Sequence, residues 1–295
     1  MLDFYLGIKG DGNLASHLSS GNVKYSLKLS IGIVNYNTAD LTKKLLESIF
    51  KKDSGFDPET MEVIVLDNGL LDPCSSWIKK FNVKYLQNKD NAGFSKGYNK
   101  TIKYSLGEYY LMLNSDIEVL KGGISKLIEV ADEFKEEVVI GGKLFFPDMS
   151  NQDSAFHLPT LSGAFKEYFL ARKGSYFMFM PKSLGGVSGP PGSRLDSRPP
   201  MADPPRWVQV EGLVMACFMI PKKIIEKVGL LDEGSFIFFE DIEYCRRLKS
   251  FDIPLYFVPD AKFIHHHGAS TKKIGQEKAV ELLQKAAQHY HGKIY

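Results

Sequence analysis

The chain has few cysteines and no long apolar segment. Only Cys74, Cys217 and Cys245 occur in its 295 residues, without the spacing of a metal site. Such a small, odd number excludes a disulfide-stapled scaffold and favours a reducing compartment. The longest apolar run, from Leu213 to Ile220, is far too short to span a membrane. No basic segment followed by an apolar one stands at the N-terminus, so we expect no signal peptide and a cytoplasmic location.

An excess of one charge is also missing. The 37 Lys and Arg residues are balanced by 35 Asp and Glu residues, for a formal net charge of +2. No basic surface for nucleic acid is therefore predicted. No Gly-x-Gly-x-x-Gly follows the first predicted strand and no Gly-x-x-x-x-Gly-Lys-Ser/Thr occurs, which argues against a dinucleotide site and a P-loop NTPase.

Short apolar segments alternate with segments of helical spacing from residue 29 to residue 142. Strands are predicted at 29–34, 61–66, 83–86, 109–113 and 138–140, and helices at 41–49, 77–80, 95–105 and 124–131. Further along, the pattern predicts a helix at 242–248, strands at 255–258 and 262–264, and an amphipathic helix at 276–290. This alternation is typical of an α/β fold with a largely parallel sheet and helices on both faces.

Asp or Asn follows each of the first four predicted strands. These positions are Asn35 and Asn37, Asp67 and Asn68, residues 88–93, and residues 114–116. Ligands in such folds bind at the carboxyl ends of strands, so the pattern predicts a polar ligand cleft. Turn chemistry alone accounts for part of the pattern.

Two of these strand-end acids are candidates for ligand binding. Asp116 follows an apolar strand, where a carboxylate suits a divalent cation that bridges to phosphate oxygens. Asp67 stands where an acid can accept a hydrogen bond from a ribose hydroxyl or a base N–H. A turn residue after a strand is the alternative for both.

Two further groups could take part in chemistry. Glu240 and Asp241 follow the aromatic run 236–239 and open a predicted helix, which makes them candidates for a general base. Helix capping is the alternative. His265 and His267 share one face of a predicted strand, and one of them could complete a metal site. Surface histidines are the alternative, and the register leaves open which ring would face a metal.

The order of these segments resembles the inverting, family-two glycosyltransferases with the GT-A fold, and most of all their bacterial rhamnosyltransferase-like branch. The resemblance runs from about Leu29 to Ser270. It is carried by residues 30–37 (SIGIVNYN), 62–68 (EVIVLDN), 88–99 (NKDNAGFSKGYN), 110–116 (YLMLNSD), 228–233 (VGLLDE), 238–243 (FFEDIE), 256–260 (YFVPD) and 265–270 (HHHGAS).

The resemblance implies a role for each matching position. The positions that match the nucleotide-sugar site are Asn35, Asn37, Asp67, Asn68, Asn91, Gly93, Phe94, Asn99 and Asn114.

The remaining roles concern the metal and the reaction. Asp116 matches the last acid of the Asp-x-Asp motif and His265 the metal-contacting histidine, which implies Mn²⁺ or Mg²⁺ on the donor diphosphate. Asp241 matches the catalytic base, with Glu240 beside it. The first motif position is Asn114, which removes one carboxylate and lowers the metal affinity we expect.

The resemblance also divides the chain. Residues 1–28 form an N-terminal extension, 29–275 the GT-A domain and 276–295 a C-terminal helix. Within the domain, 29–142 is the nucleotide-binding half and 143–275 the acceptor-side half. The Gly, Pro and Ser residues at 182–206 predict a flexible loop, a lid or acceptor loop, with a linker as the alternative. The terminal helix carries Lys278, Lys285 and His289 beside its apolar stripe, so it either touches the inner membrane face or packs on the domain.

The function implied is a metal-dependent inverting glycosyltransferase of surface polysaccharide synthesis. Its expected partners are a dTDP- or UDP-sugar, with dTDP-rhamnose first, and a saccharide or lipid-linked saccharide acceptor. A homodimer is left open. Because Asn114 replaces a carboxylate, a catalytically weakened sugar-nucleotide-binding or scaffold protein remains the alternative function. A sugar nucleotidyltransferase ranks lower, because the Gly-rich N-terminal loop of that class is missing after the first strand.

Overall fold

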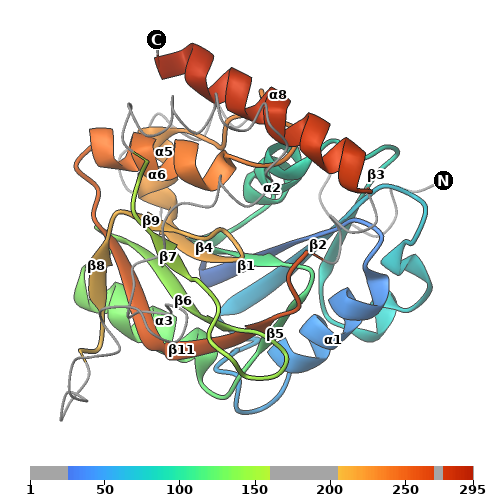
Figure 1. Cartoon of the computed structure of the whole chain (residues 1–295). Helices are drawn as coiled ribbons and strands as arrows, with labels where there is room; N and C mark the ends of the chain where they lie inside the picture. The colour runs from blue at the N-terminus through green and yellow to red at the C-terminus, as the bar shows by residue number, and fades with distance from the viewer. Residues whose placement is uncertain (1–25, 160–204, 269–274, 295) are drawn as a thin grey trace.

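The central sheet is a mixed, mostly parallel one with helices on both sides (Figure 1). The computed structural model describes residues 26–159, 205–268 and 275–294. Its strands are β1 (Leu27–Asn35), β2 (Met61–Asn68), β3 (Lys84–Asn88), β4 (Gly107–Asn114), β5 (Ile117–Val119), β6 (Val139–Phe145), β7 (Ala155–Phe156), β8 (Val208–Val210), β9 (Gly212–Leu213), β10 (Cys217–Pro221) and β11 (Leu255–His265). Its α-helices are α1 (Ala39–Ile49), α2 (Phe94–Lys103), α3 (Gly123–Glu133), α5 (Lys222–Val228), α6 (Glu240–Ser250) and α8 (Gln276–Ile294).

The strand order of the main sheet is β3-β2-β1-β4-β10-β6-β11-β5, and β8 pairs with β11. β3, β2, β1 and β4 are mutually parallel, as the alternation predicts. β10 runs antiparallel between β4 and β6, which joins the two halves of the chain into one sheet. β7 and β9 form a separate antiparallel pair.

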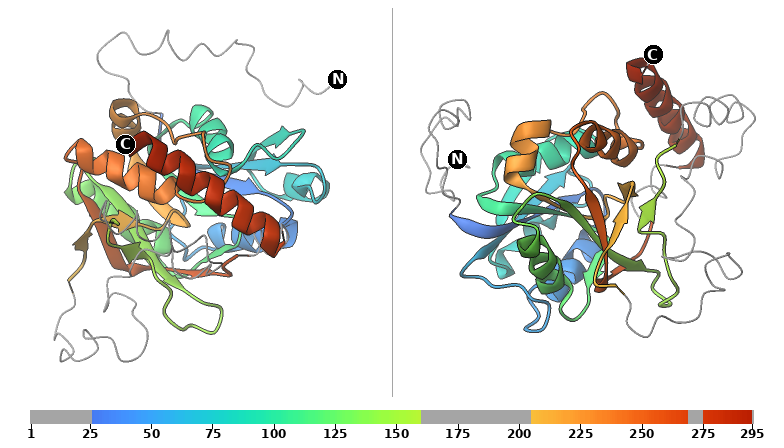
Figure 2. Two further views of the ribbon diagram at one scale, coloured as in Figure 1. Left: turned by 45° about the horizontal axis from the view of Figure 1, so that its top comes forward. Right: turned by 90° about the vertical axis from the view of Figure 1, so that its left-hand side faces the viewer.

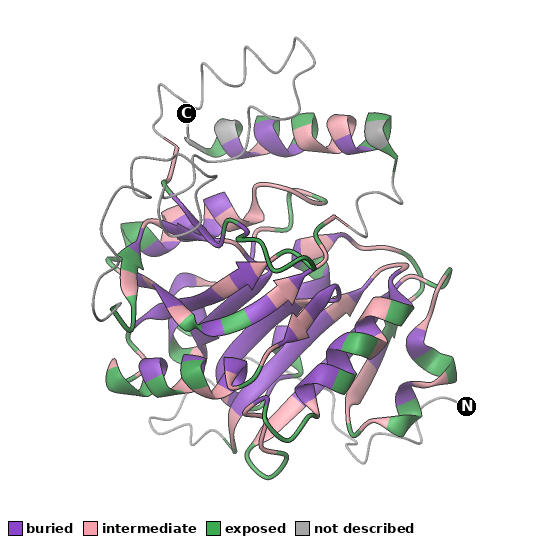
Figure 3. Ribbon diagram, turned by 60° about the horizontal axis from the view of Figure 1, so that its bottom comes forward, coloured by how far each residue is buried: buried purple, intermediate pink, exposed green. Residues whose placement is uncertain are grey.

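Helices cover both faces of the sheet, and β4 shows why. Its side chains alternate, so Tyr109 and Leu111 pack in one core while Tyr110 and Met112 pack in the other. The first core lies under α1 and α3, and the second under α2, α5 and α6 (Figure 2). Buried strands between helices with exposed outer faces are visible in Figure 3. The prediction of an α/β fold with two covered faces is confirmed.

Three details of the predicted elements are wrong. The helix expected at 77–80 is a pair of 3₁₀ turns, η2 (Cys74–Ser76) and η3 (Ile78–Lys80), because so short a segment forms a single tight turn more readily than an α-helix. The strands expected at 255–258 and 262–264 are one strand, β11, with a shift in register between Val258 and Lys262. Pro259 lies in that gap and has no N–H to donate, so the ladder is interrupted while the chain keeps its direction. The apolar run 213–220 contributes β10, which the periodicity leaves unassigned because both of its faces are buried.

The C-terminal helix packs on the domain. Ala279, Ala286, Ala287 and Tyr290 of α8 are buried. Across the described ranges 26–159, 205–268 and 275–294, no helix combines the length and apolarity that a membrane crossing needs. Most of the expected N-terminal extension (1–25) and of the Pro-rich loop (182–204) lies outside the described residues.

Candidate active site

The polar strand ends meet at one edge of the sheet. Asn35 of β1 is in register with Asp67 of β2, and Asn68 of β2 with Asn88 of β3. On the other side of β1, Val34 is in register with Asn114 of β4. Because these four strands are parallel, their carboxyl ends form a continuous polar edge, as the sequence predicts.

Asn35 and Asp67 form a buried hydrogen-bonded pair at this edge. Asn35 Nδ2 donates to Asp67 Oδ1 at 2.7 Å, and both side chains are at most 2% exposed. Asp67 Oδ2 accepts further hydrogen bonds from Cys74 N and from the Tyr85 hydroxyl. Asn35 Oδ1 accepts from the N–H and hydroxyl of Thr38, just before α1. The pair therefore fixes the backbone at the ends of β1 and β2, while its predicted contacts with a nucleotide stay a prediction.

A second amide group shapes the loop before α2. Asn68 Nδ2 donates to Asn91 Oδ1 at 2.9 Å and to the carbonyl of Gly93 at 3.0 Å. Asn68 Oδ1 accepts from Ala92 N at 3.1 Å. Gly93 adopts φ +89°, and a Cβ there would lie 2.5 Å from the carbonyl oxygen of Phe236. Only glycine fits so close an approach in that left-handed conformation.

Asp116 and His265 form the candidate metal-binding pair. His265 Nε2 lies 3.3 Å from Asp116 Oδ1, and both residues are about nine-tenths buried or more. His265 faces Asp116, whereas His266 contacts Glu118 and His267 is exposed; which ring would face a metal stays a prediction.

The environment of His265 favours a cation between the two residues. His265 Nδ1 lies 2.8 Å from Gln152 Oε1, and with the amide in this orientation its oxygen can only accept, which makes Nδ1 the donor. In the neutral ring, Nε2 then directs a lone pair at the carboxylate of Asp116. Two electron-rich atoms in this position are stabilised by a proton on Nε2 or by a metal ion. Metal-binding histidines characteristically donate their second ring N–H in this way.

The donor set is small. Within the described residues, no group of three or more His, Cys, Asp and Glu side chains gathers as a metal site. One carboxylate and one imidazole nitrogen nevertheless fit a divalent cation that completes its coordination with phosphate oxygens and water, as Mg²⁺ does in phosphoryl sites. The residues present fit Mn²⁺ or Mg²⁺ only together with a phosphate-bearing ligand.

Glu240 and Asp241 open α6 after two strained residues. Phe238 and Phe239 adopt φ +77° and +67°, which bulky residues rarely do. Burial raises the pKa of both carboxyl groups, and the charge of Asp241 raises that of Glu240 further. Glu240 Oε2 is buried and has no hydrogen-bond partner among the described residues. Strain and raised pKa values together are typical of functional sites.

Tyr98 of α2 binds the carboxyl end of β4. It is 1% exposed, and its hydroxyl donates to the carbonyl of Leu113 at 2.9 Å, with Asn114 Oδ1 at 3.3 Å. Burial raises the pKa of Tyr98, and the charges of Tyr110, Asp116 and Glu240 raise it further, in that order. Phe94, whose ring packs on Tyr98, donates its N–H to the carbonyl of Phe236, so the segment before α6 lies next to α2 and the end of β4.

The side chain of Asn99 is buried and hydrogen-bonded to the segment that precedes α6. It is 1% exposed, its Nδ2 donates to the Leu231 carbonyl and to Glu233 Oε1, and its Oδ1 accepts from Leu231 N. This amide ties α2 to the segment before α6, and its predicted place in the nucleotide pocket is left a prediction. Asn37 lies at φ +56°, a conformation that asparagine tolerates, and Phe94 packs on Tyr98 with ring centroids 4.6 Å apart.

Several residues that build the site were not among the predicted site residues, although Ser115 and Asp232 lie inside the quoted motifs 110–116 and 228–233. Gln152, Thr38, Ser115 and Asp232 contact predicted site residues or the loop that presents them. Gln152 follows β6 in a segment without periodicity, so nothing in the sequence marks it. Tyr98 lies inside the motif 88–99 and could have been selected as the aromatic partner of Phe94.

Replacing Glu240 by glutamine is expected to stabilise the fold at pH 8. The folded-state pKa of Glu240 is raised, so the wild-type protein loses stability as pH rises through that pKa, and a neutral amide removes this penalty. We expect an increase of about 1–2 kcal/mol in the free energy of unfolding at pH 8 that shrinks towards pH 5. Urea unfolding of the variant measures it, with Glu47→Gln on the exposed side of α1 as control. Equal stabilities at pH 8 would show that the Glu240 charge carries no penalty.

Comparison with known proteins gives a family match and curated relatives. Residues 30–186 match the family described as "Glycosyl transferase family 2". The low-salt glycan biosynthesis hexosyltransferase Agl10 of Haloferax volcanii is 27% identical over 225 residues, which are 75% of this chain and 61% of that protein. An N-acetylglucosaminyl-diphospho-decaprenol L-rhamnosyltransferase of Mycobacterium tuberculosis is 26% identical over 243 residues, which are 78% of this chain and 72% of that protein. The chain thus spans less than two thirds of the length of the first of these relatives.

Solved structures share the fold at low sequence identity. The crystal structure of S. aureus TarS 1–349 superposes with a TM-score of 0.54 at 17% identity, over 86% of this chain and 65% of that one. The structure of GalNAc-T7 with UDP, GalNAc and Mn²⁺ superposes with a TM-score of 0.58 at 15% identity, over 81% of this chain and 44% of that one. At such identities the likeness establishes the fold alone.

Proposed function

The chain belongs to glycosyl transferase family 2 and has the GT-A fold that its motifs predict, and from this premise we propose that it is a metal-dependent inverting glycosyltransferase. It would transfer a sugar from a nucleoside diphosphate to a saccharide or lipid-linked saccharide. The observation that carries the proposal is the pairing of Asp116 with His265 next to the polar strand ends. This pair would hold a divalent cation for a diphosphate at the edge where α/β folds bind nucleotides.

The chemistry follows from the residues. Negative charge builds up on the leaving diphosphate; Asp116 and His265 would hold a divalent cation there, which would supply compensating positive charge. Asp241 accepts the proton of the acceptor hydroxyl as that oxygen attacks the anomeric carbon. Its raised pKa brings its basicity closer to neutral pH, where a general base is most effective. One base and one displacement give inversion, and no second acid is needed for the leaving group.

The relatives support the substrate class. Agl10 is named a hexosyltransferase, and the M. tuberculosis protein is named for a rhamnosyl transfer to a decaprenol-linked sugar. A 56-residue match, 38% identical, is to the dTDP-rhamnosyl transferase RfbF of Shigella flexneri. We therefore propose dTDP-rhamnose as first donor, with UDP-sugars second, and a lipid-linked acceptor, which would place the reaction beside a membrane on its cytoplasmic side.

A weakened sugar-nucleotide-binding protein is the second candidate, because Asn114 replaces a carboxylate and the candidate metal pair has two side chains within the described part of the chain. Such a protein would bind the donor nucleotide with metal but transfer nothing. Binding and transfer must therefore be measured separately.

Thermal unfolding with nucleoside diphosphates tests the donor site. We expect dTDP or UDP with Mn²⁺ to raise the melting temperature by about 5–10 °C at a hundredfold excess over Kd, since ligands of the folded state stabilise it by mass action. ADP with Mn²⁺ and dTDP with EDTA are the controls. No shift with any nucleoside diphosphate in the presence of metal would contradict the proposal. A shift without release of nucleoside diphosphate from dTDP-rhamnose or UDP-sugars, across a panel of lipid-linked saccharides, would favour the weakened binder.

A further inference from the structure

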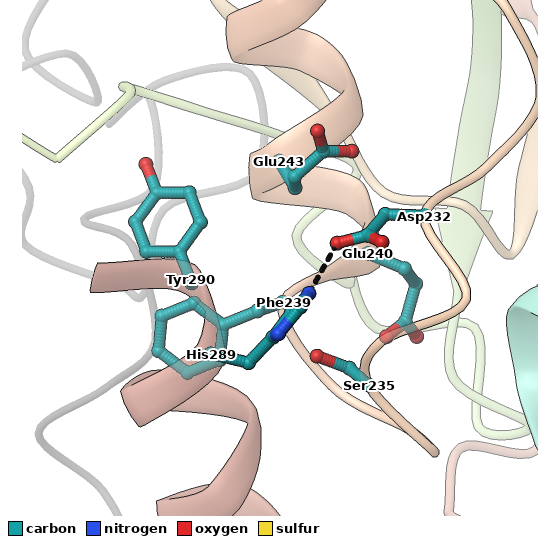
Figure 4. Close-up of a pocket in the computed structure, with 7 residues that line it drawn as sticks. All are labelled: Asp232, Ser235, Phe239, Glu240, Glu243, His289 and Tyr290. Carbon is teal, nitrogen blue, oxygen red and sulfur yellow. Dashed lines mark hydrogen bonds and ion pairs between the residues drawn. The ribbon is translucent and has the colours of Figure 1, made fainter. Parts of the chain in front are cut away.

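The loop that precedes Glu240 and Asp241 is in contact with the C-terminal helix. We call residues 229–239, which connect α5 to α6, the carboxylate loop. α8 runs across the top of the molecule near α5 and α6 (Figure 1), and residues of α8 and of this loop line a small hollow (Figure 4). The lining residues are Asp232, Ser235, Phe239, Glu240, Glu243, His289 and Tyr290.

Asp232 connects the carboxylate loop to α8 through ion pairs. Its Oδ2 lies 2.6 Å from His289 Nε2 and 2.6 Å from Lys293 Nζ, both on α8. Its Oδ1 accepts from Gly234 N at 3.1 Å within the loop. Burial opposes the charge of Asp232, but the hydrogen bonds from Lys293, Gly234 and His289 outweigh burial and lower its pKa to about 2. The carboxylate is thus ionised at neutral pH and ties the turn at 232–234 to two residues of α8.

Close packing accompanies this ion pair. The ring of Tyr290 lies 5.3 Å from the ring of Phe239, measured between centroids. A Cβ on Gly234 would lie 2.0 Å from His289 Cε1, so the imidazole lies directly on the loop backbone. The contacts at both ends of the segment 232–239 come from consecutive residues of α8.

The loop needs such support because its last two residues are strained. Left-handed φ values at Phe238 and Phe239 cost free energy and persist only where the surroundings hold them. On the opposite side, Asn99 binds the main chain of Leu231, and Phe94 N donates to the carbonyl of Phe236 at 2.8 Å. The loop is therefore held between α2, which carries the donor-site motif, and α8, which lies beyond it.

We propose that His289 of α8, acting through Asp232, is a positioning residue for the α6 carboxylates. It holds the carboxylate loop so that Asp241 keeps the orientation in which it receives the acceptor proton. The inference rests on the proposed function, and it deepens that function by giving the C-terminal helix a part in the chemical step. The ion pairs that α8 makes with Asp232 lie in the carboxylate loop, so losing them should change kcat rather than donor binding.

Variants of the His289–Asp232 ion pair test the proposal. His289→Ala and Asp232→Ala are expected to lower kcat by about 10- to 100-fold, the cost of misplacing a catalytic group by about 1 Å. The KM for the donor and the nucleoside diphosphate shift in melting temperature should stay within about twofold of wild type, because the metal pair is untouched. His289→Gln, whose amide can still donate to Asp232, should restore most of kcat. Lys285→Ala is the matched control, since Lys285 pairs with Glu281 on the exposed side of the same helix.

Hydrogen exchange tests whether His289 holds the carboxylate loop independently of any sugar transfer. The amides of Leu231 and Gly234 should exchange faster in His289→Ala than in wild type and Lys285→Ala, whether or not any sugar is transferred. Unchanged exchange would overturn the proposal even if the wild-type protein transfers sugar. A wild-type kcat in both His289→Ala and Asp232→Ala would also overturn it, and so would an equal loss of kcat in Lys285→Ala. A wild-type protein without transferase activity would contradict the proposed function alone, and the exchange rates would still decide whether α8 holds the loop.

Discussion

Replacing Asp116 by alanine is expected to lower sugar transfer by about 10³-fold or more, an increase of about 4 kcal/mol in the barrier. Asp116 provides the only carboxylate of the candidate metal pair, and Asn114 contributes no second charge. The variant should also lose the Mn²⁺-dependent rise in melting temperature with dTDP or UDP. Initial rates with dTDP-rhamnose or UDP-sugars and thermal unfolding with nucleoside diphosphates measure the two effects.

The fold of this variant should persist, because the Asp116 carbonyl, which accepts from His266 N at 2.9 Å, is retained. Glu118→Gln is the matched control: Glu118 lies two residues further on and contacts His266, outside the candidate metal pair. Full metal-dependent nucleotide binding in Asp116→Ala would contradict the assignment of Asp116. Equal losses in the control variant would indicate a general disturbance of this segment instead.

Replacing Asp241 by asparagine is expected to lower kcat by about 10²- to 10⁴-fold, the contribution typical of a general base. Asparagine has almost the same shape but cannot accept the acceptor proton. Donor binding should remain, because Asp241 is separate from the Asp116–His265 pair. Rate measurements at saturating donor, together with the thermal shift by nucleoside diphosphate, distinguish the two steps.

The pH dependence gives the same residue a second test. A base must be deprotonated to act, so kcat/KM of the wild type should fall as pH drops through the pKa of Asp241. Burial raises that pKa, so the acid limb should lie at least about one pH unit above the ordinary aspartate value of about 3.9. Glu243→Gln, two residues further along α6 and paired with Arg247, should leave the limb in place. An unshifted limb with full activity in Asp241→Asn would exclude Asp241 as the base.

Local patterns in the sequence were enough to predict the alternating architecture and the edge at which the site lies. Apolar strands with both faces covered, followed by Asp or Asn, leave few alternatives to a parallel sheet with a polar carboxyl edge. The motif order also identified the family, which the family match confirmed. These properties depend on local periodicity and on motifs of a few residues, which can be read without knowing what each side chain contacts.

The tertiary structure alone decided which residues face one another. His265 rather than His267 meets Asp116 because β11 ends at His265, with its side chain directed into the core edge. Gln152 and Asp232 contact their partners across 113 and 57 residues of sequence, and β10 inserts between β4 and β6 from a distant segment. Asn35 and Asp67, both matched to the nucleotide site, proved to be bonded to each other. Such pairings depend on packing of distant segments, and the spacing of residues along a chain carries no record of it.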